Sequence, residues 1–209
     1  MNCYFFKVTF ALFCFAFFAI SGCISSAPSR FYLLQPTEMD KETRSEIKNA
    51  KVKNTPIALG IGPVEIPEYL CRPQIVTMLD DSVIQIAEFD RWAEPLKSNI
   101  LRVITENLSH LLNTNQITTF PWKNSLPKEY QIEIKLLRFD GKLGNDLFLN
   151  TLWRIVDSKT TKSLVIERTE IREPTKLSDY KSFVNAQNRA LATLCKEIAV
   201  ALNTIIEKR

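Results

Sequence analysis

The sequence feature that most constrains this chain is Ile20-Ser21-Gly22-Cys23, which ends a long apolar run near the N-terminus. It has the pattern of a lipobox, in which a hydrophobic residue and two small residues precede a cysteine that receives a lipid. Small side chains beside the scissile bond let the backbone enter a signal peptidase, and the thiol then accepts a diacylglyceryl group. We therefore expect a signal peptide over residues 1–22 and an exported domain acylated at Cys23.

The residues before the lipobox fit this interpretation. The apolar run from Val8 to Ile20 is shorter than the roughly 18 to 20 residues that a spanning helix needs. An uncleaved amphipathic or transmembrane anchor is the alternative, which the small residues before Cys23 disfavour. A multiply acylated cysteine anchors a protein stably. Ile24 stands where bacterial lipoproteins retained in the inner membrane carry Asp, so we expect the outer membrane, with the domain facing the periplasm.

Composition predicts one domain without a nucleic-acid site. A chain of 209 residues without a 22-residue leader suits a single domain. Its net charge is +4, and one of those charges, Lys7, leaves with the leader, so the balance argues against binding of nucleic acid. Only Cys71 and Cys195 remain beside Cys23. A Cys71–Cys195 disulfide could form in an oxidising periplasm, but two separately buried thiols are the preferred interpretation.

The remaining pattern predicts an α+β domain over residues 30–209, after a lipidated tether over 23–29. We expect residues 36–55, which are polar and charged, to form a mobile loop. Gly60-Ile61-Gly62-Pro63 lacks the rest of a phosphate loop and is better explained by close packing in a strand. We expect an antiparallel or mixed sheet with two amphipathic helices packed on it. The expected elements are strands over 30–34 and 57–64, a β-hairpin over 74–87, a helix from Pro95 to about Asn113, a meander over 130–139, 147–156 and 164–171, and a helix capped by Ser178 or Asp179.

No catalytic set, metal site or cofactor motif is evident in the sequence. His110, the single histidine, lies on a helical flank without an evident Ser or Cys partner and is expected at the surface. Asp80 and Asp81 are better explained as turn formers than as acid–base or metal-binding groups. We therefore predict that the chain is not an enzyme.

Two runs of residues carry a resemblance to a known family. They are Ile66-Pro67 with Tyr69-Leu70-Cys71-Arg72-Pro73-Gln74-Ile75-Val76, and Arg91-Trp92-Ala93-Glu94-Pro95-Leu96. With these runs the chain resembles the PqiC-like auxiliary lipoproteins of ABC-type transport systems, over essentially the whole mature sequence. One departure is Cys71, where a polar residue such as Asp is expected.

The resemblance implies a non-enzymatic role beside an MCE-domain protein. Such proteins form rings or tubes that move lipids between the two membranes, and the lipoprotein would hold the end of that conduit at the outer membrane. Candidate positions for docking the partner, or a neighbouring subunit of a homo-oligomer, are Tyr69, Arg72, Pro73, Arg91 and Trp92. Alternatively, these residues only brace the hairpin against the first helix.

Two other functions stay open at this point. An outer-membrane lipoprotein could activate a cell-wall enzyme, although the roughly 30 residues before Ile57 form a short tether for that reach. A lipid-binding carrier would need a large apolar cavity between sheet and helices, whereas the regular alternation of apolar residues predicts ordinary packing.

Overall fold

The computed structural model describes residues 27–37, 57–122 and 127–208. The lipobox with Cys23, the signal peptide and nearly all of the expected loop over 36–55 lie outside the described residues. The described elements are β1 (Arg30–Tyr32), β2 (Leu59–Glu65), the 3-10 turn η1 (Glu68–Leu70), β3 (Gln74–Met78), β4 (Ile84–Trp92), α3 (Leu96–Leu112), β5 (Ile117–Thr119), β6 (Tyr130–Gly141), β7 (Asp146–Asp157), β8 (Ser163–Pro174) and α4 (Tyr180–Glu207). This confirms an α+β fold.

The larger sheet contains five strands in the order β5-β2-β6-β7-β8. Strands β6, β7 and β8 form the expected antiparallel meander, and β2 pairs in parallel with both β5 and β6. Alternation along β6 buries Ile132, Ile134 and Leu136 and turns Glu133 and Lys135 to the opposite face. One face of this sheet is therefore built to be covered and the other is polar.

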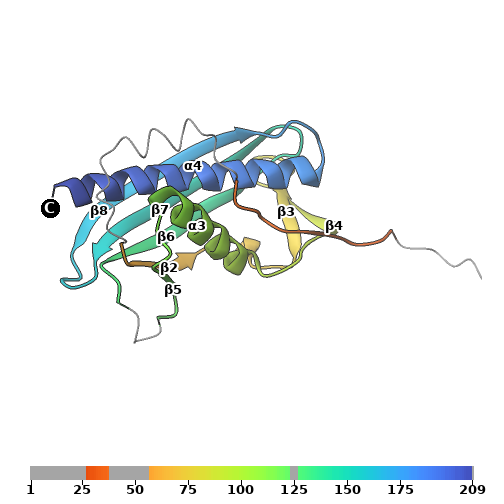
Figure 1. Cartoon of the computed structure of the whole chain (residues 1–209). Helices are drawn as coiled ribbons and strands as arrows, with labels where there is room; N and C mark the ends of the chain where they lie inside the picture. The colour runs from red at the N-terminus through yellow and green to blue at the C-terminus, as the bar shows by residue number, and fades with distance from the viewer. Residues whose placement is uncertain (1–26, 38–56, 123–126, 209) are drawn as a thin grey trace, which may run out of the picture.

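Both helices lie on the same side of the long strands (Figure 1). Their apolar stripes meet the inner face of the sheet, so that Ile100, Ile104 and Leu108 of α3 and Leu191 and Leu194 of α4 are fully buried. Among the described residues, no helix combines the length and apolar character needed to cross a membrane.

The ends of both helices agree with the expected signals. Asp179 caps α4, because its carboxylate accepts a hydrogen bond from the backbone N–H of Ser182 at 2.6 Å. Asn113 ends α3 in the left-handed conformation, and Pro95 precedes the first residue of that helix. Of the two expected caps of α4, the structure therefore selects Asp179.

A second, three-stranded sheet in the order β1-β4-β3 is the main difference from the expected single sheet. The expected hairpin is present as β3 and β4, but β4 continues to Trp92, beyond residue 87, where we expected the hairpin to end. The reason is long-range pairing, since Arg30, Phe31 and Tyr32 of β1 lie beside Asp90, Arg91 and Trp92 in parallel register. The N-terminal strand thus holds the end of β4 extended.

Candidate docking site

A pocket of about 500 Å³ opens between the turn that precedes β3 and the junction of β4 with α3. Its walls combine apolar side chains with a thiol, two cations and a carboxylate. It is lined by Ile66, Cys71, Arg72, Pro73, Trp92, Ala93, Glu94, Pro95, Leu96 and Lys97.

The first wall is the 3-10 turn η1. The backbone N–H of Leu70 donates to the carbonyl of Pro67 at 3.0 Å, and that of Cys71 donates to Glu68 at 2.9 Å. Leu70 is buried beneath the turn, which leaves the Cys71 side chain exposed. Arg72 is oriented by a 3.0 Å hydrogen bond from its Nε to the carbonyl oxygen of Tyr69.

The second wall is the end of β4. Trp92 belongs to the buried core, with only 5% of its surface exposed, and its backbone N–H donates to the carbonyl of Pro73 at 2.7 Å. The next residue, Ala93, donates its backbone N–H to the carbonyl of Tyr32 at 2.8 Å. The pocket therefore lies where β1, the end of β4 and the start of β3 meet.

The carboxylate of Glu94 in the pocket is held by two side chains of α3. Glu94 accepts hydrogen bonds from the Nδ2 of Asn99 and, at 3.4 Å, from the Nε of Arg102. Arg72 and Lys97 have no ion-pair partner among the residues that the structure describes. An apolar pocket with two available cations at its rim suits an apolar segment that carries a carboxylate.

The structure brings together three of the five residues predicted for docking, namely Arg72, Pro73 and Trp92. Tyr69 is engaged elsewhere, because its hydroxyl donates to the buried carboxylate of Asp140 on β6, and burial together with this bond raises the pKa of the phenol. Tyr69 therefore braces η1 against the larger sheet. Arg91 neighbours Trp92 in β4, so its side chain points to the opposite face of the strand.

Sequence reasoning did not propose Ile66, Glu94, Leu96 or Lys97 as docking residues, although Ile66, Glu94 and Leu96 lie in the runs that carry the family resemblance. Pro95 is the residue from which these pocket positions could have been predicted. A strand that ends just before a helix-opening proline brings the first residues of the helix next to the last side chain of the strand.

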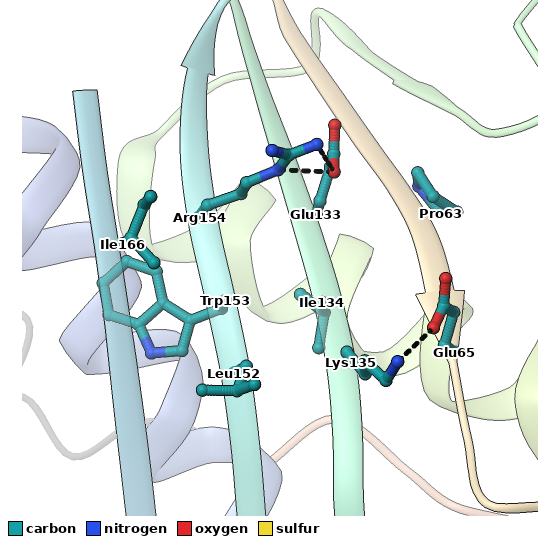
Figure 2. A pocket seen from close by; sticks show the side chains of 9 residues that line it. All are labelled: Pro63, Glu65, Glu133, Ile134, Lys135, Leu152, Trp153, Arg154 and Ile166. Atoms are coloured by element: carbon teal, nitrogen blue, oxygen red, sulfur yellow. Dashed lines mark hydrogen bonds and ion pairs between the residues drawn. The ribbon is translucent and has the colours of Figure 1, made fainter. Parts of the chain in front are cut away.

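A smaller hollow of about 220 Å³ lies on the larger sheet around β6 and β7 (Figure 2). Figure 2 shows Arg154 and Glu133 pointing toward one another, and their closest atoms are 2.6 Å apart. The Nζ of Lys135 likewise forms an ion pair with the carboxylate of Glu65 at 3.3 Å. The charged groups of this hollow neutralise each other, which makes it a less suitable site for a charged ligand than the pocket at Arg72.

A third hollow of about 750 Å³ lies between β8 and the C-terminal half of α4. At one wall, Trp153 donates its indole N–H to Thr169 at 3.0 Å. Charged residues stand among its apolar ones, including Glu167, Arg168 and Glu197. This lining differs from the apolar cavity that a lipid carrier would need.

The two cysteines are separate and unlike. Both are free thiols, but Cys71 is exposed, so the expectation of two buried thiols is wrong for Cys71. The cause is the 3-10 turn, which places Leu70 inward and the next residue outward. Cys195 is buried in α4, and burial raises the pKa of its thiol to about 12.

The remaining polar residues that we considered have structural positions. Asp80 forms the hairpin turn, because its carboxylate accepts the backbone N–H groups of Ser82 and Val83 at 2.9 and 2.8 Å, and these bonds lower its pKa. His110 is exposed on α3, as expected. Within the described ranges, no group of His, Cys, Asp or Glu is arranged to hold a metal ion.

Two solved structures share this fold at low sequence identity. An uncharacterized protein is 15% identical, with a TM-score of 0.66 over 84% of this chain and 99% of that chain. A Xanthomonas campestris protein of family DUF330 is 11% identical, with a TM-score of 0.68 over 86% of this chain and 99% of that chain. At such identities the likeness shows the fold alone.

Sequence comparison identifies the family. No functionally curated protein matches this chain significantly. The family model for the ABC-type transport auxiliary lipoprotein component matches residues 32–199, which include every strand from β2 to β8 and most of α4. This chain therefore belongs to the family of ABC-type transport auxiliary lipoprotein components.

Proposed function

We propose that this protein is a non-enzymatic lipoprotein, anchored at Cys23 in the outer membrane, that docks the periplasmic conduit of an MCE-type lipid transport system. Its membership of a transport auxiliary family supports a role beside other transport components. The lipobox supports the anchor, and Ile24 after the cysteine supports the outer membrane. The docking site is the pocket around Arg72, Pro73 and Trp92.

The observation that carries this proposal is the position of the pocket beside the tethered end of the domain. Strand β1 lies next to Trp92, and Arg30, the first residue of β1, is seven residues after Cys23. Even when fully extended, seven residues span at most about 25 Å. A chain acylated at Cys23 therefore holds the pocket close to the membrane, where the end of a conduit would arrive.

The side chains of the pocket suit binding better than catalysis. Its one nucleophile is the Cys71 thiol, which donates to the carbonyl of Pro67 and has no histidine or carboxylate base as a hydrogen-bond partner among the described residues. The carboxylate of Glu94 is held by Asn99 and Arg102. What remains available is apolar surface and two cations, which recognise a partner without changing it.

The pocket therefore fits an apolar segment of the MCE-domain protein that carries an acidic side chain or a C-terminal carboxylate. Apolar contact with Ile66, Pro73 and Pro95 supplies the buried part of such an interface, and Arg72 with Lys97 supplies its orientation. A neighbouring subunit of a homo-oligomer could offer the same kind of segment.

The test is affinity capture of the membrane-extracted lipoprotein, followed by mass spectrometry of the retained proteins. We expect an MCE-domain protein in stoichiometric amount. The double variant Arg72→Ala, Lys97→Ala should lose most of that protein. A matched control is Arg168→Ala, Lys159→Ala, which removes two exposed cations from other parts of the surface.

Other results would contradict the proposal. Retention of a cell-wall enzyme without an MCE-domain protein would support the role of an activator. Equal retention by the parent and the pocket variant would place the partner on another surface.

A further inference from the structure

The outer face of the three-stranded sheet exposes large apolar side chains close to the tether. Side chains that pair across neighbouring strands share a face, and the register pairs Phe31 with Arg91, Val76 with Ile86 and Met78 with Ile84. Gln74 pairs with Arg91 and continues the alternation of β3, which places all these residues on one side. We call this surface the Phe31 face; it comprises Phe31, Gln74, Val76, Met78, Ile84, Ile86 and Arg91.

The opposite side of the same sheet is the one that packs on the domain. Ile75, Thr77, Asp90 and Trp92 alternate with the residues of the Phe31 face and are all buried. On the Phe31 face itself, Val76 is buried, but 67% of Phe31, 39% of Ile84 and 44% of Ile86 is exposed. Exposed apolar side chains of this size on one face of a sheet suit a surface that meets another apolar phase.

Arg91 adds a cation to this face. No described acidic side chain forms an ion pair with Arg91, and its Nε has no hydrogen-bond partner among the described residues. The neighbouring cation, Arg30, differs because it pairs with Asp90 at 2.8 Å. The Nε of Arg91 is buried and the residue is half-buried, so it is the terminal nitrogens of the guanidinium that can bind the phosphate of a lipid headgroup, while exposed apolar neighbours enter the upper part of the acyl chains.

The position of the tether selects a lipid surface as the occupant. Phe31 is eight residues after Cys23, and Figure 1 shows the described N-terminal segment leaving the molecule beside β3 and β4, at the end opposite to the C-terminus of α4. We infer that the Phe31 face rests on the membrane in which the Cys23 lipid is inserted, and that it binds phospholipid headgroups through Arg91. This inference rests on the anchor in the proposed function and adds a second membrane contact.

Two acidic residues limit how deeply the sheet can enter. Asp80 and Asp81 form the tip of the hairpin, and the carboxylate of Asp80 is kept ionised by its hydrogen bonds to backbone N–H groups. Charged carboxylates do not enter hydrocarbon. The hairpin therefore lies along the headgroup region with its Phe31 face inward, and does not insert tip first.

Fluorescence quenching tests this contact. The full mature lipoprotein carrying Phe31→Trp or Ile86→Trp is reconstituted into phosphatidylethanolamine–phosphatidylglycerol vesicles that contain phospholipids brominated on the acyl chains. We expect loss of most of the fluorescence added by the new tryptophan, stronger with bromine near the glycerol end of the chain than near its terminus. Ile166→Trp is the matched control, because Ile166 is 68% exposed on β8, and its fluorescence should be retained.

A second variant tests the role of Arg91. In the Ile86→Trp background, Arg91→Gln should reduce the quenching, whereas Lys159→Gln, a change at an exposed lysine after β7, should leave it unchanged. Equal quenching in the Arg91 variant would overturn the assignment of headgroup binding to Arg91.

Flotation of the same vesicles separates this inference from the proposed function. A protein that floats with the vesicles without quenching at Phe31→Trp and Ile86→Trp keeps its anchor and overturns the Phe31 face. A protein that does not float lacks the anchor and overturns both. Fluorescence of these tryptophans that depends on the protein-to-lipid ratio and not on bromine would assign the face to a second copy of the chain instead.

Discussion

The backbone N–H of Trp92 donates to the carbonyl oxygen of Pro73 at 2.7 Å, and this bond joins the two walls of the proposed docking pocket. Trp92 is part of the core as well as of the pocket, whereas Arg72 is only half-buried at its rim. Substitutions at these two residues should therefore have different effects on stability.

We expect Trp92→Ala to lower the free energy of unfolding by about 3–5 kcal/mol, because it removes a buried aromatic side chain and leaves a cavity. Arg72→Ala should change it by less than about 1 kcal/mol, since it removes one partly exposed hydrogen bond. Urea unfolding of both variants checks this. A large loss in Arg72→Ala would make Arg72 a structural residue and an unsuitable probe of docking.

Asn99 clamps the segment after β1 onto α3. Its side chain accepts the backbone N–H of Leu34 at 2.6 Å and donates to the carbonyl of Leu34, and Asn99 and Leu34 are both fully buried. Asn99→Ala should lower the free energy of unfolding by about 1–3 kcal/mol, because the N–H of Leu34 then loses its partner in a dry site. Asn188→Ala, which removes an exposed bond to Gln35, is the control and should cost less. Equal midpoints of urea unfolding for the two variants would contradict the clamp.

The two thiols should differ in reactivity. In the folded mature protein, a maleimide should modify Cys71, which is exposed, and spare Cys195, which is fully buried. Mass spectrometry should show one adduct before denaturation and two afterwards. Two adducts in the folded protein would mean that α4 opens, and none would mean that Cys71 is covered or oxidised.

Stability should fall at alkaline pH, in part because of Cys195. Burial raises the pKa of its thiol from 9.0 to about 12, so the unfolded chain releases this proton at lower pH than the folded chain does. The resulting stabilisation is complete below pH 9 and is lost as the pH rises toward about 12. Tyr32, whose pKa is raised from 10.0 to about 12, adds to the loss in the upper part of this range.

Urea unfolding at several pH values between 9 and 11 measures this slope. Cys195→Ala should lose less stability over this range than the parent protein, although it is less stable at neutral pH because it leaves a small cavity. Identical slopes in the two proteins would show that Cys195 is not the group responsible.

Local patterns predicted much of this fold. The alternation of Ile132, Ile134 and Leu136 predicted β6, and the helical spacing of Ile100, Ile104 and Leu108 predicted α3. These elements follow from periodicity because each has one face turned to the core.

Contacts between distant residues were beyond the same reasoning. The parallel pairing of Tyr32 with Trp92 joins residues sixty positions apart, and three residues of strand composition do not identify a partner strand. Without this pairing, the predicted strand ended at residue 87, before Arg91 and Trp92. The prediction therefore did not show that these two side chains point to opposite faces of β4. The exposure of Cys71 depends on the 3-10 turn, which periodicity does not reveal.

The parallel pairing of β1 with β4 also determines where mechanical load enters the domain. In a chain held at Cys23, tension between the membrane and a bound partner runs through the tether into β1, and from there to the clamp between Leu34 and Asn99. Trp92 lies in the strand that β1 grips, so the pulled element adjoins the wall of the pocket. If Cys23 carries the lipid and the pocket binds a conduit, as we propose, a pull on the lipid would strain the backbone that shapes the pocket, and the conduit and its anchor would then bear the same load.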